Sequence, residues 1–134
     1  MSWRVDTSQW PVVIHTVEGA MTNEEVDEYI LEATTVLKRG GRHATIMDSS
    51  NVGSVSAYVR SRAVEWRRTH QEELKAHCVA TAYVLSSPIV RFIAMTVFMV
   101  SRLPTPWRVC HSLEEAHAWV KTHLDAIEPS TRSG

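Results

Sequence analysis

The chain has 134 residues, which suits one domain with its own hydrophobic core. A hydrophobic fraction of 44% and a charged fraction of 22% are typical of a globular protein and exclude a disordered one. A formal net charge of −1 gives no overall attraction to nucleic acid or to an anionic membrane.

The N-terminal third predicts a hairpin followed by a helix. The β-branched run 10–17 predicts a strand, and residues 3–5 predict a short edge strand beside it. Segment 21–41 has apolar residues at helical spacing. Its start carries a capping box, because Thr22 is followed three residues later by Glu25.

The rest of the chain continues this alternation of strands and helices. Alternating elements of this kind predict an α/β fold with a mostly parallel sheet, right-handed crossovers, an N-terminal edge hairpin and about four helices. We expect a single domain over 1–127 and a flexible tail over 128–134. The remaining predicted elements are strand 43–47, a long helix 54–77, strand 78–87, helix 89–103, strand 107–111 and a last helix capped by Ser112.

No segment has the ~20 apolar residues that a membrane span needs, and the N-terminus lacks a signal-peptide core. We therefore expect a cytoplasmic protein without an integral membrane segment. Cys78 and Cys110 lie in apolar runs, which is typical of reduced thiols in a core.

The stretch after the strand at 43–47 reads Asp48-Ser49-Ser50-Asn51-Val52-Gly53. A strand followed by Asp-Ser-Ser, an apolar residue and Gly resembles the signature of STAS domains, the SpoIIAA-type anti-sigma-factor antagonists. The segments YVLSSPIVRFI and VCHSLEEAHAWV look like later parts of the same family, so the resemblance covers about residues 10–125. Asn51 stands where the family usually has Gly. The resemblance implies a STAS/SpoIIAA-like fold.

The resemblance also implies a function. It implies a non-enzymatic bacterial signalling module that binds a regulatory protein, such as a kinase or an anti-sigma factor. Ser50, and after it Ser49, would be the phosphorylation sites at the start of the second helix, with Asp48, Asn51 and Gly53 completing the binding surface. Helix N-terminal amides would tolerate the added phosphate. The same residue types also serve as plain helix caps and turns, which leaves a purely structural role open.

Segment 89–103 is apolar around nearly its whole circumference, unlike an ordinary surface helix. It predicts a helix that is packed deeply, forms a homodimer interface, or covers an apolar ligand pocket. Phe92, Met95, Phe98 and Met99 are the candidate residues. The third interpretation gives an alternative function, a carrier or sensor of an apolar, lipid-like small molecule.

The sequence gives little support for chemistry. His70 and His77 lie about 10.5 Å apart along a helix, too far for one metal ion. No zinc-binding spacing, nucleophile elbow or phosphate-binding loop occurs. We expect no enzyme activity, cofactor or metal. The arginines of 54–77 are balanced by glutamates, so nucleic acid is not an expected partner.

Overall fold

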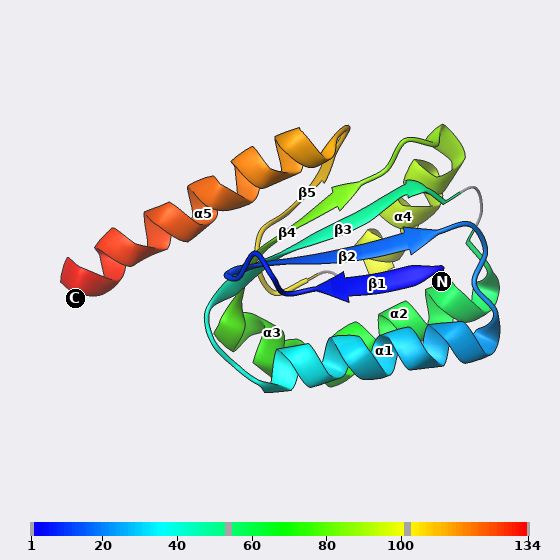
Figure 1. Cartoon of the computed structure of the whole chain (residues 1–134), viewed down its shortest axis with the longest axis horizontal. Helices are drawn as coiled ribbons and strands as arrows, with labels where there is room; N and C mark the ends of the chain where they lie inside the picture. The colour runs from blue at the N-terminus through cyan, green and yellow to red at the C-terminus, as the bar shows by residue number, and fades with distance from the viewer. Residues whose placement is uncertain (1, 53–54, 101–102, 134) are drawn as a thin grey trace.

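The computed structural model describes residues 2–52, 55–100 and 103–133, and in them one five-stranded sheet in the order β1-β2-β3-β4-β5 (Figure 1). β1 is antiparallel to β2, and the other neighbours are parallel. The predicted edge hairpin and mostly parallel sheet are therefore confirmed. The strands are β1 (Trp3–Asp6), β2 (Val12–Glu18), β3 (His43–Asn51), β4 (Cys78–Val84) and β5 (Trp107–Cys110).

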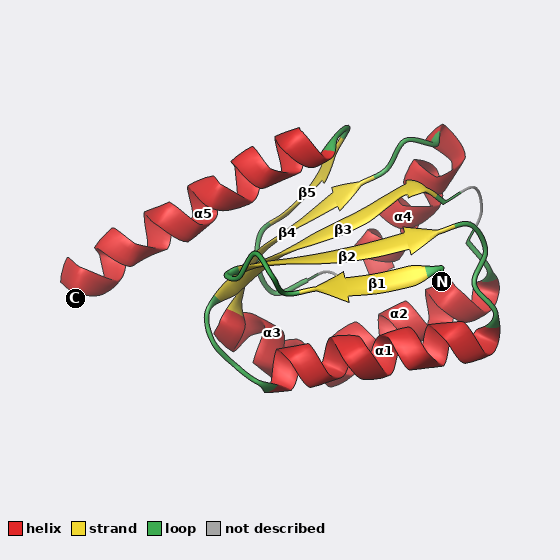
Figure 2. Cartoon of the chain, viewed as in Figure 1, coloured by secondary structure: helices red, strands yellow, loops and turns green. Residues whose placement is uncertain are grey.

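Helices cover both faces of the sheet (Figure 2). α1 to α4 lie on one face and α5 on the other. The parallel strands add one after another in a single direction, so crossovers of one hand put all their helices on one face. The helices are α1 (Asn23–Lys38), α2 (Ala57–Thr69), α3 (Gln71–His77), α4 (Pro88–Val100) and α5 (Leu113–Ser133).

α1 begins where the sequence predicts. The Thr22 hydroxyl accepts from the Glu25 N–H (3.1 Å), and a Glu25 carboxylate oxygen accepts from the Thr22 N–H (3.0 Å). The reciprocal pair satisfies two amides that the helix itself leaves without partners.

The predicted long helix 54–77 is wrong, because it is two helices. α2 ends at Thr69, and His70 leaves helical geometry with φ −108° and ψ 21°. The Trp66 carbonyl accepts from the His70 N–H (3.0 Å), and the His70 ring Nδ1 lies 3.0 Å from the same oxygen. This side-chain contact lies at the end of α2, and α3 starts at Gln71, so the structure describes five helices.

The face under α5 holds a filled core. Alternate residues of β3 and β4 point to it, including Ile46 and Ala82, both 0% exposed. Ala116 and Val120 of α5 pack on them. The small residues of β4, such as Ala82, leave room for the side chains of α5 against the sheet.

The domain boundary at 127 and the flexible tail 128–134 stay predictions. The backbone of α5 continues to Ser133, and residue 134 lies outside the described residues. None of the helices that the structure describes is long and apolar enough to cross a membrane.

Candidate functional site

The Asp-Ser-Ser motif lies in a strand and not at a helix start. β3 runs to Asn51. Asp48 lies opposite both Thr16 of β2 and Val84 of β4, and beyond it the pairing continues on the β2 side alone, where Glu18 lies opposite Asn51. α2 begins only at Ala57, after Ser56 caps it by accepting from the Val59 N–H. The predicted position of Ser50 at the start of the second helix is therefore wrong.

Within the motif, Ser50 is tied to Asp48. The Ser50 hydroxyl donates to Asp48 Oδ1 (2.7 Å), and the Ser50 N–H donates to the same oxygen (3.2 Å). The Ser86 hydroxyl donates to the Ser50 carbonyl, which fastens the end of β3 to the β4–α4 connection. A phosphate on Ser50 would stand beside a carboxylate and not on helix amides, so it would meet repulsion. Phosphorylation of Ser50 or Ser49 stays a prediction.

The other motif residues divide between surfaces. Ser49 points to the opposite face of the sheet from Ser50, as strand alternation requires, and lines the cavity described next. Asn51 is exposed, and its Nδ2 donates to Glu18 Oε2 at 3.5 Å. Gly53 lies outside the described residues.

A cavity of about 560 Å³ separates the sheet from α1, α2 and α4. Its floor is the face of β2, β3 and β4 that alternation turns away from α5. Its walls are the inner faces of the three helices, where one alanine of each helix lies among larger apolar residues. The floor residues include Val13, His15, Met47, Ser49, Tyr83 and Leu85, and the wall alanines are Ala33, Ala63 and Ala94.

Contacts between α1 and α2 hold these two walls of the cavity together. Trp66 Nε1 donates to the Thr34 hydroxyl (2.8 Å), and the Tyr58 hydroxyl donates to Asp27 Oδ1 (2.6 Å). One end of the space is closed by Leu74 of α3, which packs with Leu37 and Cys78. Contacts between helices thus fix the walls, and the cavity lies between them and the sheet.

The cavity reaches the surface at the carboxyl edge of the parallel strands. Among its lining residues, Gly19, Ala20 and Ser56 are exposed, in the β2–α1 connection and at the cap of α2. Ser49 stands at the same edge. Ligands of open α/β sheets commonly bind at this edge, outside the ends of the strands.

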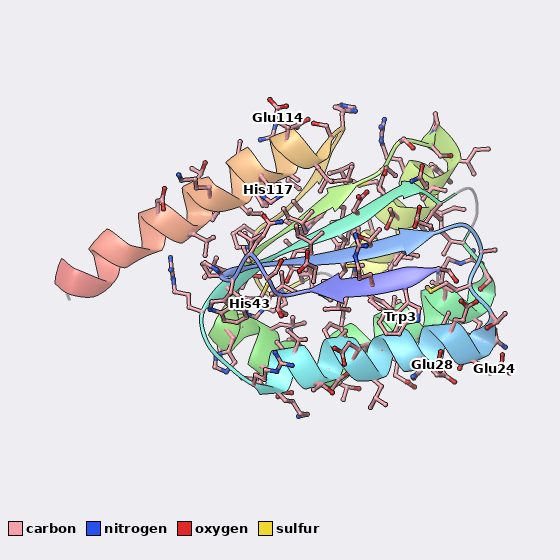
Figure 3. All side chains as sticks on the ribbon, in the orientation of Figure 1. Trp3, Glu24, Glu28, His43, Glu114 and His117 are labelled. Atoms are coloured by element: carbon pink, nitrogen blue, oxygen red, sulfur yellow. The ribbon has the colours of Figure 1, made fainter. Side chains whose placement is uncertain are left out.

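One polar pair interrupts the apolar floor. The Tyr29 hydroxyl oxygen lies 2.7 Å from His15 Nδ1 and 3.4 Å from Met47 Sδ. Burial, and then the charge of His43, lower the pKa of His15 to about 4, and burial raises the pKa of Tyr29. Both groups are therefore neutral near pH 7, and their mutual contact satisfies them without water. Tyr29 also contacts Trp3, which projects from β1 toward α1 (Figure 3); the two ring centroids lie 5.8 Å apart.

Two arginines of α2 also line the cavity. Arg67 Nη2 donates to the Tyr83 hydroxyl (2.6 Å), and its Cζ lies 4.9 Å from the Phe98 ring centroid. Arg60 Nη1 donates to the Val55 carbonyl (2.8 Å). No aspartate or glutamate is found among the lining residues that the structure describes.

α4 has two different apolar faces, which explains why its sequence is apolar nearly all round. Phe98 is 4% exposed and packs between Tyr83 and Trp107, with ring centroids 4.5 and 4.7 Å away. Phe92 is 74% exposed and Met99 76% exposed. Met95 lies between these extremes at 38%. The four candidate residues are thus divided between two surfaces: Phe98 lines the cavity, and the other three are exposed. Their role at a dimer or ligand surface stays a prediction. Residues 101–102 of the predicted helix lie outside the described residues.

The cysteines are both free and buried, as predicted. In the described part of the chain, no group of three or more His, Cys, Asp or Glu is arranged to hold a metal ion.

The overall arrangement can be compared with solved structures. An uncharacterized protein of the DUF3478 family from Shewanella loihica PV-4, with a SpoIIAA-like fold, superposes at a TM-score of 0.65 over 87% of this chain and 90% of that one. This chain has a SpoIIAA-like fold. The predicted fold is thereby confirmed, and at 12% sequence identity the likeness concerns the fold alone. No family model matches the sequence, and no curated protein matches it.

In this SpoIIAA-like chain the cavity is the feature that sequence reasoning located least well. Segment 89–103 predicts a helix over an apolar pocket as one of three alternatives, and α4 does line the cavity. The contributions of α1 and α2 to its walls have no comparable signal. Alanines at inward positions of three helices form a weak pattern, since alanine is also the commonest filler of close helix contacts. Only the distance between the helices and the sheet distinguishes an alanine that lines a cavity from one that fills a close helix contact.

Proposed function

We propose that this protein binds an apolar small molecule in the cavity between the sheet and helices α1, α2 and α4, and acts as its carrier or sensor. The observation that carries the proposal is the cavity of about 560 Å³ with a mainly apolar lining. Small-molecule sites typically have volumes of roughly 300–1,000 Å³ and walls of this composition.

Energetics favour an occupant. At roughly 24 cal/mol per Å³, an enclosed empty space of 560 Å³ would cost about 13 kcal/mol, an upper bound because this cavity opens to the surface. That cost is comparable with the whole stability of a typical domain. Water would need two to four polar partners per molecule, and the lining supplies few. An apolar ligand that removes 200 Å² of wall from water would contribute roughly 5 kcal/mol.

The ligand can be tested directly. Protein purified from a bacterial host is analysed by native mass spectrometry, and its organic extract is analysed separately. The expected result is added mass that organic extraction removes, together with uptake of a neutral apolar dye, N-phenyl-1-naphthylamine, by the extracted protein. Extracted protein that is folded, and yet takes up no dye and binds no apolar compound, would contradict the proposal.

A second candidate is the regulatory protein-interaction module that the motif predicts. The observation that favours it is the exposed outer stripe of α4, which consists of Ile89, Phe92, Met95 and Met99. Exposed apolar patches commonly mark interaction sites. The partner proposed is a signalling protein of the kinase or anti-sigma type, or a second copy of this chain. Two free buried cysteines support a cytoplasmic location for either function.

This candidate has its own test. Intact-mass analysis of protein from its native host should find a single phosphate that is absent from a Ser50→Ala variant. Absence of phosphate under every growth condition, with unchanged partner binding by Ser50→Asp, would exclude a phosphorylation switch.

A further inference from the structure

The charges around the cavity specify its ligand more closely than its volume does. Arg60 and Arg67 lie on one side of α2, seven residues and thus about 10.5 Å apart along the axis, and both line the cavity. Among the lining residues that the structure describes there is no carboxylate to oppose them. A cationic ligand would therefore meet two like charges, whereas an anionic one would meet two opposite charges in a mainly apolar space, where such interactions are strongest.

Tyr83 supplies a hydrogen-bond donor beside Arg67. Its hydroxyl oxygen accepts from Arg67 Nη2 at 2.6 Å, and the side chain is 8% exposed. A phenol has one proton of its own to donate, and no described residue accepts it. Burial raises the pKa of Tyr83, so the proton stays in place near neutral pH. A buried hydroxyl that accepts from a cation and still has a proton to give is well suited to an anion.

The rings around Arg67 fix its position. Its Cζ lies 4.9 Å from the Phe98 ring centroid and 5.7 Å from that of Tyr83. A guanidinium held against aromatic faces loses less freedom when it meets an anion than an exposed one does. The rest of the cavity, beside α1 and α4, is lined mainly by aliphatic side chains, which suit an extended hydrocarbon chain.

We propose that the ligand is a long-chain carboxylate, with its head group on the Tyr83 hydroxyl beside Arg67 and its hydrocarbon chain along the apolar wall. This inference rests on the proposed ligand-binding function. A carboxylate is preferred to a phosphate because its single negative charge matches the single hydrogen-bond donor of Tyr83. Arg60, the second arginine, lies about two helical turns away from Arg67.

The test compares two ligands that differ only in the head group. Palmitic acid and 1-hexadecanol are titrated at pH 8 into extracted protein, with displacement of N-phenyl-1-naphthylamine as the readout. The wild type should bind the acid at least tenfold more tightly than the alcohol. Tyr83→Phe and Arg67→Gln should each reduce this ratio severalfold, and Arg60→Gln should reduce it less.

Two features keep the outcome decisive. The exposed neighbour Arg68, which does not line the cavity, gives the matched control Arg68→Gln, expected to leave the ratio unchanged. The ratio is measured on one preparation, so partial misfolding of a variant cancels. Equal affinity for acid and alcohol, or a ratio that survives both Tyr83→Phe and Arg67→Gln, would overturn the carboxylate inference alone. Failure of the acid, the alcohol and the dye to bind would overturn the ligand-binding function as well.

Discussion

His15 of β2 and Tyr29 of α1 meet in the interior, with the imidazole Nδ1 2.7 Å from the phenol oxygen. The pair joins the sheet to the first helix at the cavity floor. It also makes the stability of the protein depend on pH. Burial lowers the pKa of His15 from 6.5 to about 4, so in the folded chain this imidazole stays neutral where the unfolded chain protonates it.

We predict that stability falls as pH decreases from 6.5 toward 4. In this window the unfolded state binds a proton at His15 that the folded state does not, and the loss ends below pH 4, where both states are protonated. Between pH 6.5 and 5, His15 accounts for about 2 kcal/mol of this loss.

Urea denaturation of wild type and His15→Gln at several pH values measures the effect. Glutamine can still hydrogen-bond to Tyr29 and does not titrate. His43, whose pKa is raised and acts in the opposite direction, is present in both proteins. Because its charge also lowers the pKa of His15, the difference between the two proteins measures His15 together with that coupling. Parallel pH profiles of the two proteins would show that His15 does not titrate as described.

A larger side chain at Ala63 should fill part of the cavity. We predict that Ala63→Phe abolishes uptake of the neutral dye and leaves the fold intact, because the new ring enters space that the wild type leaves open. Ala76→Phe, on an exposed position of α3, is the matched control and should bind dye normally. Circular dichroism and dye fluorescence check both. A folded Ala63→Phe variant that still binds dye with wild-type affinity would argue against this cavity as the site.

A negative charge at Ser50 should be costly because of Asp48. We predict that Ser50→Asp destabilises the protein by about 1 kcal/mol, since two carboxylates would replace a hydroxyl–carboxylate bond of 2.7 Å. In an Asp48→Asn background the same substitution should cost much less. Thermal denaturation of the four proteins in this double-mutant cycle gives the coupling, and additivity within error would mean that the two side chains do not interact.

The outer stripe of α4 should decide whether the protein dimerises. We predict that the wild type is a dimer at high concentration and that Phe92→Glu with Met99→Glu makes it monomeric, since both side chains are largely exposed in the single chain. Leu31→Glu, at a 70% exposed position of α1, should not. Light scattering at two concentrations provides the measurement, and a wild type that is monomeric throughout would exclude the dimer. Val97 and Phe98 are unsuitable probes, because they line the cavity.

Local sequence signals predicted the order of elements well. The Thr22–Glu25 box and the β-branched run before it act over a few residues, so they survive any tertiary context. The end of β3 could not be predicted in this way. Asp48 and Ser50 are poor strand residues by composition. Asp48 is paired with β2 and β4 on both sides, and Ser50 is held by its bonds to Asp48 and by the Ser86 hydroxyl.

The sequence does not predict the break at His70, and it predicts an apolar pocket only as one of three alternatives for segment 89–103. Apolar residues at helical spacing continue across His70, and its imidazole contact with the Trp66 carbonyl is a geometric event. The inward faces of α1, α2 and α4 have the apolar pattern of packed helices. That pattern predicts which face of a helix is buried, but it does not predict the distance between the helix and the sheet.

The two faces of the sheet should differ in how readily they open locally. α5 packs on the buried residues of β3 and β4 on one face, while four helices cover the other face, which holds the cavity. Amides of β3 and β4 should consequently exchange their hydrogens only on global unfolding, and amides of α2 should exchange through smaller openings. Such openings would let a ligand enter and leave the cavity while the α5 side keeps its native structure.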